Sequence, residues 1–471
     1  MKKFYLNCTI MAMLLGGMTT VSCGDEEPED NETPDTPITP TDPDKDKALS
    51  SVEQKERMEA IALEFMEQMP SDDFKNLGEL ADYVLDTYCT DDYDWNEVEE
   101  WADDILDAAA KATGVVRHEE EFWDGWMYNE YYKEYKSLLF ASNFTGTFTA
   151  RAGKWTYSKS DDLKFIFNDK QGQECVLKLT TGGNVKKVHA FNIEDWQDYD
   201  YDYEGNVSNN FYNYTQYTIG VPEKIDVTLT QGGTQLVRTA VRIDLSSISG
   251  EEFDLSRNSL TASAEVEMNN GYKWEVSDVA YTANTKASTK CTMSKNGKQL
   301  ITVAVAGDVS GIPSCNVSAF SEYDFDIDDY NTDKATAKNA FVKVDILGKM
   351  QMQGVITDVR KYAEYLEDAY DNDESESMFK SYINQANALS DISIFYDNSA
   401  VKQADIMLEP FAETDWSYTY WEAEPVIKFY DGSSYSSFEA FFNDRDFKNV
   451  IDTFKSLANR YADMVNERIE W

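Results

Sequence analysis

The feature that most constrains this chain is a long stretch, from Phe144 to about residue 307, in which apolar and polar residues alternate with a period of two. Pairs of alternating segments flank short turns that contain glycine: LKFIFN and ECVLKLT flank DKQGQ, KIDVTLT and LVRTAVRIDL flank QGGTQ, and LTASAEVEM and YKWEVSDVAYTA flank NNG. One more pair, KASTKCTM and KQLITVAVAG, flanks SKNG. Such alternation is typical of antiparallel hairpins, so residues 143–312 are predicted to form a large, curved sheet of about ten strands.

The region before this sheet, residues 48–142, has a helical period instead. Met58, Ile61 and Phe65 recur at three- and four-residue spacing, which predicts an amphipathic helix with one buried stripe. A second helix is expected over 76–88, starting at a capping-box-like pair, Asn76 and Glu79. The segment VEEWADDILDAAAKA predicts a third, and the aromatic stretch 119–140 is expected to be a fourth.

The last third, residues 313–471, mixes the two periods. AFVKVDILGKMQMQG, DISIFYD, KQADIMLEPF and EPVIKFYD are predicted strands, residues 355–389 hold two predicted helices, and a helix is expected near 447–468. A short helix should precede it, capped by Ser436 and Glu439. The whole pattern predicts an α+β fold in which an N-terminal helical segment and a C-terminal mixed region cover a large antiparallel sheet.

The N-terminus has the layout of a secretory signal over residues 1–22: two lysines, an apolar run of about 15 residues, and small residues before Cys23. This run is shorter than a membrane-spanning helix requires. Residues 23–47 follow with five of the ten prolines and many acidic residues. A segment of this composition cannot bury a core, so it is predicted to be an extended tether.

The sequence VSCGDEEPED resembles the lipobox and acidic export run of surface lipoproteins of the Bacteroidota type, with Thr20 where a leucine is usual. The resemblance covers about the first 30 residues and implies lipidation of Cys23, for example with palmitate, and attachment to the outer membrane at the cell surface. An ordinary secreted protein is the alternative. A multi-acyl anchor buries far more methylene groups than one myristoyl chain and would hold the protein on the membrane.

Charge and residue supply exclude several functions. The formal net charge of −45 repels phosphate backbones, so no nucleic-acid partner is expected. With two histidines, His118 and His189, and no HExxH, GxSxG or Walker A motif, most catalytic templates fail. A glycosidase with a pair of catalytic carboxylates remains possible, but with 87 acidic residues the sequence does not single out any pair. Four cysteines outside the first 23 residues leave open a disulfide, such as Cys291 to Cys315, or buried thiols.

A cofactor is not required by any motif, but calcium is one possibility. Asp200, Asp202 and Glu204 precede Gly205 as in the first half of an EF-hand loop, yet Phe211 stands where a bidentate glutamate is needed. A second acidic run, YDFDIDDYNTD, has Ala335 at the corresponding position. Solvated acidic loops are the simpler explanation of both runs.

Aromatic residues make up 13% of the chain and gather beside Asp, Asn and Ser in three stretches: EFWDGWMYNEYYKEY, NIEDWQDYDYDYEGNVSNNFYNYTQY and DWSYTYW. Their flat apolar faces and polar rims suit stacking on sugars or anchoring a protein partner. The predicted ligand-binding residues are Trp196, Tyr199, Tyr201, Tyr203, Trp416, Tyr418 and Trp421.

The sequence therefore predicts a lipid-anchored envelope protein that binds a glycan or an envelope partner without catalysis. Two alternatives stay open. One is a polysaccharide hydrolase that uses paired carboxylates. The other is a carrier of lipids or other apolar molecules, since a long sheet with helices on one side is similar to the half-barrel folds that carry lipids between membranes.

Overall fold

The computed structural model describes residues 48–90, 92–112, 117–123, 128–140, 143–196, 210–250, 253–254, 256–310, 337–415, 418–433, 435, 441–442 and 447–464. Its helices are α2 (Ser51–Glu67), the short 3-10 helix η2 (Ser71–Asp73), α3 (Lys75–Tyr88), α4 (Asn96–Ala112), α5 (Val359–Tyr370), α6 (Glu376–Leu389) and α8 (Lys448–Met464). The strands are β1 (Arg117–Trp123), β2 (Tyr128–Phe140), β3 (Gly146–Arg151), β4 (Lys154–Ser158), β5 (Leu163–Asn168), β6 (Glu174–Trp196), β7 (Asn210–Gln231), β8 (Thr234–Asp244), β9 (Leu260–Met268), β10 (Tyr272–Thr282), β11 (Lys286–Lys295), β12 (Lys298–Asp308), β13 (Asn339–Ile346), β14 (Met350–Ile356), β15 (Ser390–Tyr396), β16 (Ala404–Asp415) and β17 (Tyr418–Phe429).

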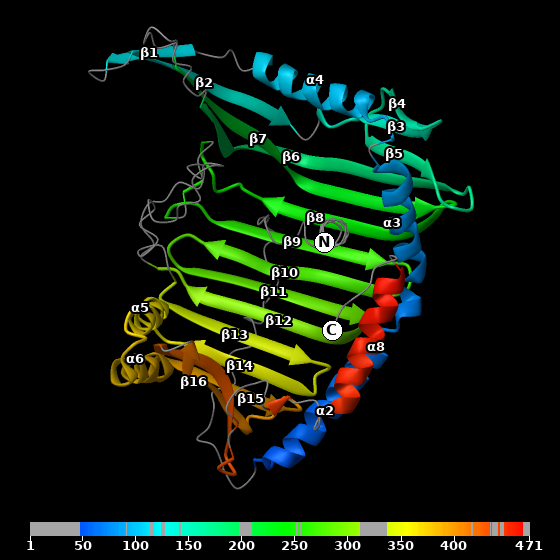
Figure 1. Ribbon diagram of the computed structural model, residues 1–471. Coiled ribbons are helices and arrows are strands. Elements are labelled where there is room, and N and C mark those ends of the chain that lie inside the picture. Colours follow the sequence, from blue (N-terminus) through cyan, green and yellow to red (C-terminus); the bar gives the residue numbers. More distant parts are fainter. Residues whose placement is uncertain are drawn as a thin grey trace.

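The 17 strands form one open sheet (Figure 1). Hydrogen-bonded pairs run from β4 through β3, β5, β6 and β7, and then in chain order from β8 to β17. Strands β2 and β1 form a branch on the first half of β7, whose second half pairs with β8. Among the strand pairs that the structure describes, only β2–β7 and β3–β5 are parallel. The predicted α+β fold, with helices before and within the last part of a mostly antiparallel sheet, is confirmed.

The sheet has one apolar face and one polar face, as its alternation predicts. Register fixes the faces, because paired residues lie on the same side: Leu177, Leu229 and Val237 are on the apolar face, which we call the helix face. The opposite face, which we call the polar face, carries ion pairs on β7–β10, including Arg238 with Glu265 at 2.8 Å. These side chains are about a third exposed, so the polar face there is in contact with solvent.

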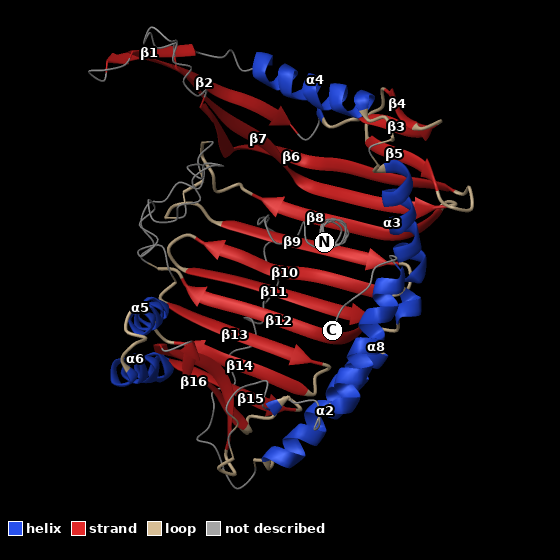
Figure 2. Ribbon diagram, viewed as in Figure 1, coloured by secondary structure: helices blue, strands red, loops and turns tan. Residues whose placement is uncertain are grey.

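All the described helices with buried side chains pack on the helix face. Figure 2 shows α2, α3 and α8 along one end of the central strands, with α5 and α6 at the other end of β13–β16. One cluster joins α2 and α8 to strands β10–β17, another joins α3 and α4 to β3–β9, and a third joins α5 and α6 to β16 and β17. Helices from both ends of the chain therefore share one face of a single sheet.

One polar node fixes the link between α2 and α3 to the sheet. The carboxylate of Asp73 accepts a hydrogen bond from Lys295 Nζ at 2.6 Å, and Tyr272 Oη donates to the carbonyl oxygen of Gln68 at 2.6 Å. Lys295 Nζ lies 3.0 Å from the same carbonyl oxygen. Tyr272 is 1% exposed, and its burial, together with Asp73, raises the pKa of its hydroxyl. A charged hydrogen bond at this junction holds the helices in place over β10 and β11.

Two of the outer edges of the sheet, β4 and β17, are capped. On β4, Asp94 pairs with Trp155 and Gly153 through the backbone, and the Glu97 carboxylate accepts from the Tyr157 N–H. On β17, the N–H of Trp421 donates to the Asp373 carbonyl oxygen at 2.9 Å, and Pro425 has no N–H to offer. Both arrangements reduce the number of unpaired backbone N–H and C=O groups to which another strand could pair.

Residues 117–140 correct one prediction. The expected aromatic helix over 119–140 is wrong, because this stretch forms strands β1 and β2. Phe122, Trp126 and Tyr132 have near-helical spacing, but the many tyrosines favour strands, and β2 finds a partner in the equally tyrosine-rich β7 about 80 residues further on. A pairing between residues about 80 positions apart leaves no signal in the sequence of either strand.

The sequence predicts where helices form better than it predicts the residues that cap their N-termini. The predicted cap at Asn76 and Glu79 is wrong, since α3 begins at Lys75 with Phe74 as its N-cap and no side-chain hydrogen bond there. A true capping box, Ser50 with Glu53, begins α2. The predicted helices in 355–389 and near 447–468 are confirmed as α5, α6 and α8, whereas Ser436 and Glu439 lie outside the described residues.

The described cysteines are free thiols. Cys175 is buried, which raises the pKa of its thiol to about 11, and burial also raises the pKa of Cys89 and Cys291. Because Cys291 is a free thiol, the disulfide to Cys315 that the sequence permits is not formed in this structure; Cys315 itself lies outside the described residues.

The start of the folded body is tied to β17 by a carboxylate, which makes stability depend on pH. Asp431 accepts hydrogen bonds from Ser433 and from the Ser51 N–H at 2.7 Å, and these lower its pKa to about 2. A lowered carboxyl pKa stabilises the fold above the unfolded value of about 3.9, and this stabilisation is lost as the pH falls toward 2. Asp431→Asn should therefore reduce the free energy of unfolding at pH 7, with a deficit that shrinks between about pH 4 and pH 2.

Urea denaturation at a series of pH values measures this deficit. Asp371→Asn, an exposed aspartate after α5, is the matched control and should show no such pH dependence. A deficit that stays constant down to pH 2 would contradict the role of the Asp431 charge.

Candidate functional site

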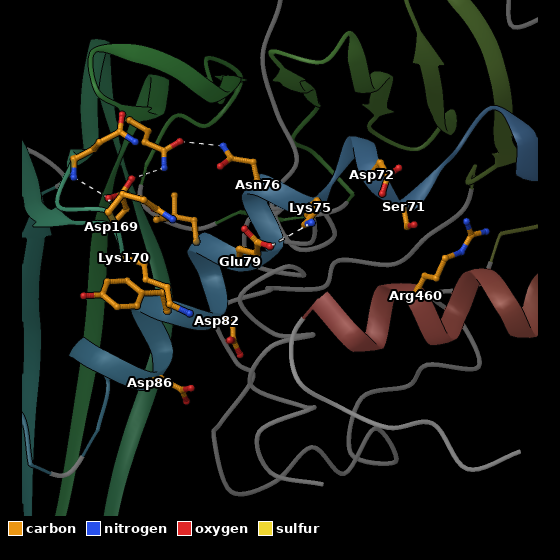
Figure 3. A pocket seen from close by; sticks show the side chains of 15 residues that line it. Ser71, Asp72, Lys75, Asn76, Glu79, Asp82, Asp86, Asp169, Lys170 and Arg460 are labelled. Atoms are coloured by element: carbon orange, nitrogen blue, oxygen red, sulfur yellow. Dashed lines mark hydrogen bonds and ion pairs between the residues drawn. The ribbon is translucent and has the colours of Figure 1, made fainter.

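A wide cleft among the described residues lies on the outer side of α3. It encloses about 800 Å³ and is bounded by η2 and α3, by the turn between β5 and β6, by the end of β7 and by α8 (Figure 3). We call it the α3 cleft. A volume of 300–1,000 Å³ is usual for sites that bind small molecules. Its lining residues are Ser71, Asp72, Lys75, Asn76, Glu79, Leu80, Asp82, Tyr83, Asp86, Asp169, Lys170, Gln171, Gln173, Gln231 and Arg460.

The amphipathic pattern of α3 explains why this cleft is polar. Glu79, Asp82, Tyr83 and Asp86 are spaced by three or four residues, so they share one side of the helix. Leu80 and Tyr88 are buried in the cluster between α3 and the sheet. The same periodicity that anchors α3 on the helix face therefore presents its acidic side to the cleft.

Asp169 organises the β5–β6 turn that forms the opposite wall. Its Oδ1 accepts the backbone N–H groups of Gln171 at 2.9 Å and Gln173 at 2.7 Å, and its Oδ2 accepts Nε2 of Gln231 at 2.7 Å. Burial on its own would raise the pKa of this carboxyl, but the hydrogen bonds outweigh it and the pKa is lowered. Asp169 is thus an anion at neutral pH, and its oxygens are occupied by the protein.

The amides of the cleft are oriented by a short relay. Asn76 Nδ2 donates to Gln231 Oε1 at 3.0 Å, and Gln231 in turn donates to Asp169. This relay fixes which end of each amide is the donor. The side chains of Gln171 and Gln173 are exposed and make no hydrogen bond in the described part of the chain, so both can serve a ligand.

The charge of the α3 cleft is mildly negative. Its lining has five carboxylates, Asp72, Glu79, Asp82, Asp86 and Asp169, and three cations, Lys75, Lys170 and Arg460. Lys75 Nζ lies 3.8 Å from Glu79 in an exposed pair that contributes little to stability. With amides, both signs of charge and the ring of Tyr83, the lining suits a ligand with many hydroxyl or amide groups rather than an anion.

The structure describes only part of the predicted binding residues. Tyr199, Tyr201, Tyr203, Trp416 and the calcium candidates Asp200, Asp202 and Glu204 lie outside the described residues. Trp196 ends β6 and Tyr418 begins β17, and only their backbone is described. Across the described ranges, no group of three or more His, Cys, Asp or Glu could hold a metal ion.

Trp421 is the one predicted binding residue whose side chain is described. It packs with Leu408 and Tyr382 in the cluster under α5 and α6, and Lys380 Nζ lies 4.3 Å from its ring centroid. One face of the ring is therefore engaged by the protein, and Trp421 serves first to seat the α5–α6 pair on β17.

Sequence reasoning missed the α3 cleft because its walls come from segments far apart. Asn76 and Gln231, which share a hydrogen bond, are 155 residues apart. Two local signals pointed to it: the acidic side of α3 and the amide-rich turn DKQGQ. Neither indicates a ligand site until the fold joins them.

The chain matches no protein-family model, no curated protein and no solved structure. No described helix has the length and apolar character needed to cross a membrane.

Asp169 supplies a test of the site's construction. Asp169→Ala should lower the free energy of unfolding by about 1.5–3 kcal/mol, because two backbone N–H groups and an amide lose a charged acceptor. Asp161→Ala, an exposed aspartate shortly before β5, is the control and should change it by less than about 0.5 kcal/mol. Chemical denaturation measures both, and equal effects would show that the turn does not depend on the Asp169 carboxylate.

Proposed function

We propose that this protein is a lipid-anchored envelope protein that binds a glycan in the α3 cleft without cleaving it. The observation that carries the proposal is the pair of exposed side-chain amides of Gln171 and Gln173 at the wall of a cleft of about 800 Å³, on a turn whose backbone N–H groups Asp169 accepts. Amides offer a donor and an acceptor at the same time, which matches a sugar hydroxyl. The ring of Tyr83 adds a flat surface on the facing helix.

Charge favours a neutral glycan over an acidic one. The cleft has more carboxylates than cations, and the whole chain has a formal net charge of −45. A uronate or phosphate-bearing polymer would be repelled at long range and would find few cations close by. Neutral sugars are not repelled in this way.

A hydrolase with paired carboxylates is less well supported. Its general acid needs a raised carboxyl pKa so that it holds a proton at neutral pH. Among the described residues, every carboxyl group whose pKa departs clearly from its ordinary value has it lowered, as for Asp162, Asp169 and Glu265. In the α3 cleft, Asp169 is also saturated by hydrogen bonds.

A carrier of apolar molecules is the second candidate, and one observation favours it. On the helix face, the apolar row of Val276, Cys291, Val303, Val344 and Met352 continues beyond the helices and is in neither of the two large clusters. Between α2, α8 and the sheet, in contrast, side chains fill the space where such a carrier would need a cavity. A fatty acid therefore belongs in any binding panel.

Binding can be measured through stability. The soluble chain from residue 48 onward, heated with neutral oligosaccharides, polygalacturonate, calcium or a fatty acid, should melt higher only with a neutral glycan. A ligand at about 100 times its Kd adds about 2.7 kcal/mol to the free energy of unfolding. A shift with the fatty acid alone would favour the carrier, and none with any compound would leave a protein partner as the better explanation.

Gln171→Ala tests the cleft itself. Loss of one or two neutral hydrogen bonds should weaken glycan binding by about 3- to 10-fold, while stability is kept because the backbone N–H of Gln171, not its side chain, binds Asp169. Gln299→Ala, an exposed glutamine on β12, is the matched control. Equal affinity of both variants by calorimetry would place the binding outside the α3 cleft.

The anchor is tested at Cys23. Cys23→Ala should abolish labelling with palmitate and release the protein from the membrane fraction, because the remaining tether has no apolar segment to hold it there. Replacement of Asp25, Glu26 and Glu27 by alanine should keep the label but reduce protease accessibility on whole cells. Membrane retention of the Cys23 variant would contradict lipidation.

A further inference from the structure

The helix face keeps one line of apolar side chains that belongs to none of the clusters under the described helices. Register places its members side by side on neighbouring strands: Val276 of β10, Cys291 of β11, Val303 of β12, Val344 of β13 and Met352 of β14. We call these five residues the apolar row. Neighbouring strands are about 4.8 Å apart, so the row is about 19 Å long, which is close to the length of an extended palmitoyl chain.

Solvent reaches this part of the helix face. Cys291 is an exposed thiol, and the other four residues of the row are only half-buried. Val305, which follows Val303 on the same face of β12, is 42% exposed although β12 has a strand on each side. A valine in the interior of a sheet is this exposed only where nothing packs over it. The row is therefore accessible to an apolar ligand.

The apolar row continues directly from the buried cluster under α2 and α8. Met352 pairs with Ile394, and Ile394 belongs to that cluster. The five side chains of the row have no charge, and their only polar group is the thiol of Cys291. An occupant would therefore bury methylene groups, and the row offers no cation to hold a carboxylate or phosphate headgroup.

The described part of the chain starts beside the same cluster. Leu49 packs against it, and the Leu49 N–H donates to Gln403 Oε1 at 2.8 Å, so the chain enters the folded body on the helix face. Cys23 and Ala48 are 25 positions apart in the sequence. A flexible chain of that length has an r.m.s. end-to-end distance of about 25–30 Å and spans at most about 90 Å. A group attached to Cys23 can therefore reach the apolar row.

We propose that the apolar row holds one acyl chain of the anchor on Cys23 while the protein is away from a membrane. This inference rests on the proposed lipidation of Cys23 and is independent of the α3 cleft. A flexible tether keeps the acyl chain at an effective concentration in the millimolar range, so weak apolar binding is enough to fill the row. A free fatty acid has no tether, and the acidic chain repels its carboxylate.

A membrane competes with the row for the same acyl chain. A bilayer buries every methylene group of a multi-acyl anchor, whereas the row contacts one side of one chain. The acyl chain should therefore leave the row when a membrane is present. The row then shields part of the anchor from water only until the protein is inserted.

Cys291 is a native reporter of occupancy because its thiol is part of the row. The lipidated protein, diluted below the critical micelle concentration of its detergent, is labelled with a maleimide, and mass spectrometry follows each cysteine. Cys291 should react about fivefold more slowly than in the non-lipidated chain from Gly24 onward, as expected for a row that is empty about a fifth of the time. Phosphatidylcholine vesicles should remove this difference. Cys89, exposed at the end of α3 and outside the row, should react equally fast in both proteins.

Two valines of similar exposure provide the matched variants. Val305→Asp places a carboxylate beside the row and should abolish the difference in Cys291 labelling between the lipidated and non-lipidated forms. Val185→Asp changes a valine of β6 that is 44% exposed and lies outside the row, and it should leave the difference unchanged. Thermal melting shows whether each variant is folded, and the comparison of the unsubstituted forms does not depend on either.

The outcomes separate this inference from the proposed anchor. Equal labelling of Cys291 in both forms, when the lipidated protein carries palmitate, would overturn the inference and leave the anchor in place. Absence of palmitate would contradict both, because the row would have no occupant. Labelling of Cys89 that is slowed as much as that of Cys291 would indicate self-association of the lipidated protein, and this result would also overturn the inference.

Discussion

Burial of the helix face is the constraint on which the rest of this structure depends. A sheet of this width leaves an apolar surface that no single helix can cover, and α2, α3, α4 and α8 must divide it. These helices come from the two ends of the chain and contact each other. Tyr461 of α8 donates to the carbonyl oxygen of Met69 at 3.1 Å, and Asn449 Nδ2 donates to Glu59 at 3.0 Å. The cover therefore forms only when both ends of the chain are in place.

Polar anchors then set the position of that cover. Apolar packing is non-directional and would let a helix slide along the sheet. The Asp73 carboxylate with Lys295, and the buried amide of Gln54, which donates to Leu49 and Gln403 carbonyl oxygens at 3.0 and 2.9 Å, each specify one position. Gln54 is fully buried, so loss of its partners would leave an unsatisfied amide in the core. These hydrogen bonds therefore fix one position of the helices on the apolar face of the sheet.

Much of this fold could be read from the sequence, because its main signal is local. Hairpins with glycine turns predict both strand limits and neighbours, and β8–β12 follow that prediction in chain order. The prediction failed for β1 and β2, whose stability comes from a parallel partner 81 residues away, as for Tyr131 and Tyr212. The α3 cleft was missed for the same reason. Its hydrogen bond between Asn76 and Gln231 is a consequence of the fold and has no signature in either segment alone.

The division of the sheet into two faces also limits where a ligand can bind. Helices occupy the apolar face at both ends of the strands, so large parts of the apolar surface are used for folding. Besides the apolar row from Val276 to Met352, the surfaces that remain are the outer sides of the helices and the polar face, and both are built from the polar half of an alternating or helical pattern. The α3 cleft lies on the outer side of a helix. A protein that uses its apolar residues in this way, and has a net charge of −45, is best suited to ligands that are polar and uncharged. On these grounds we propose a neutral glycan for the α3 cleft, because the amides on its wall can both donate to and accept from sugar hydroxyl groups.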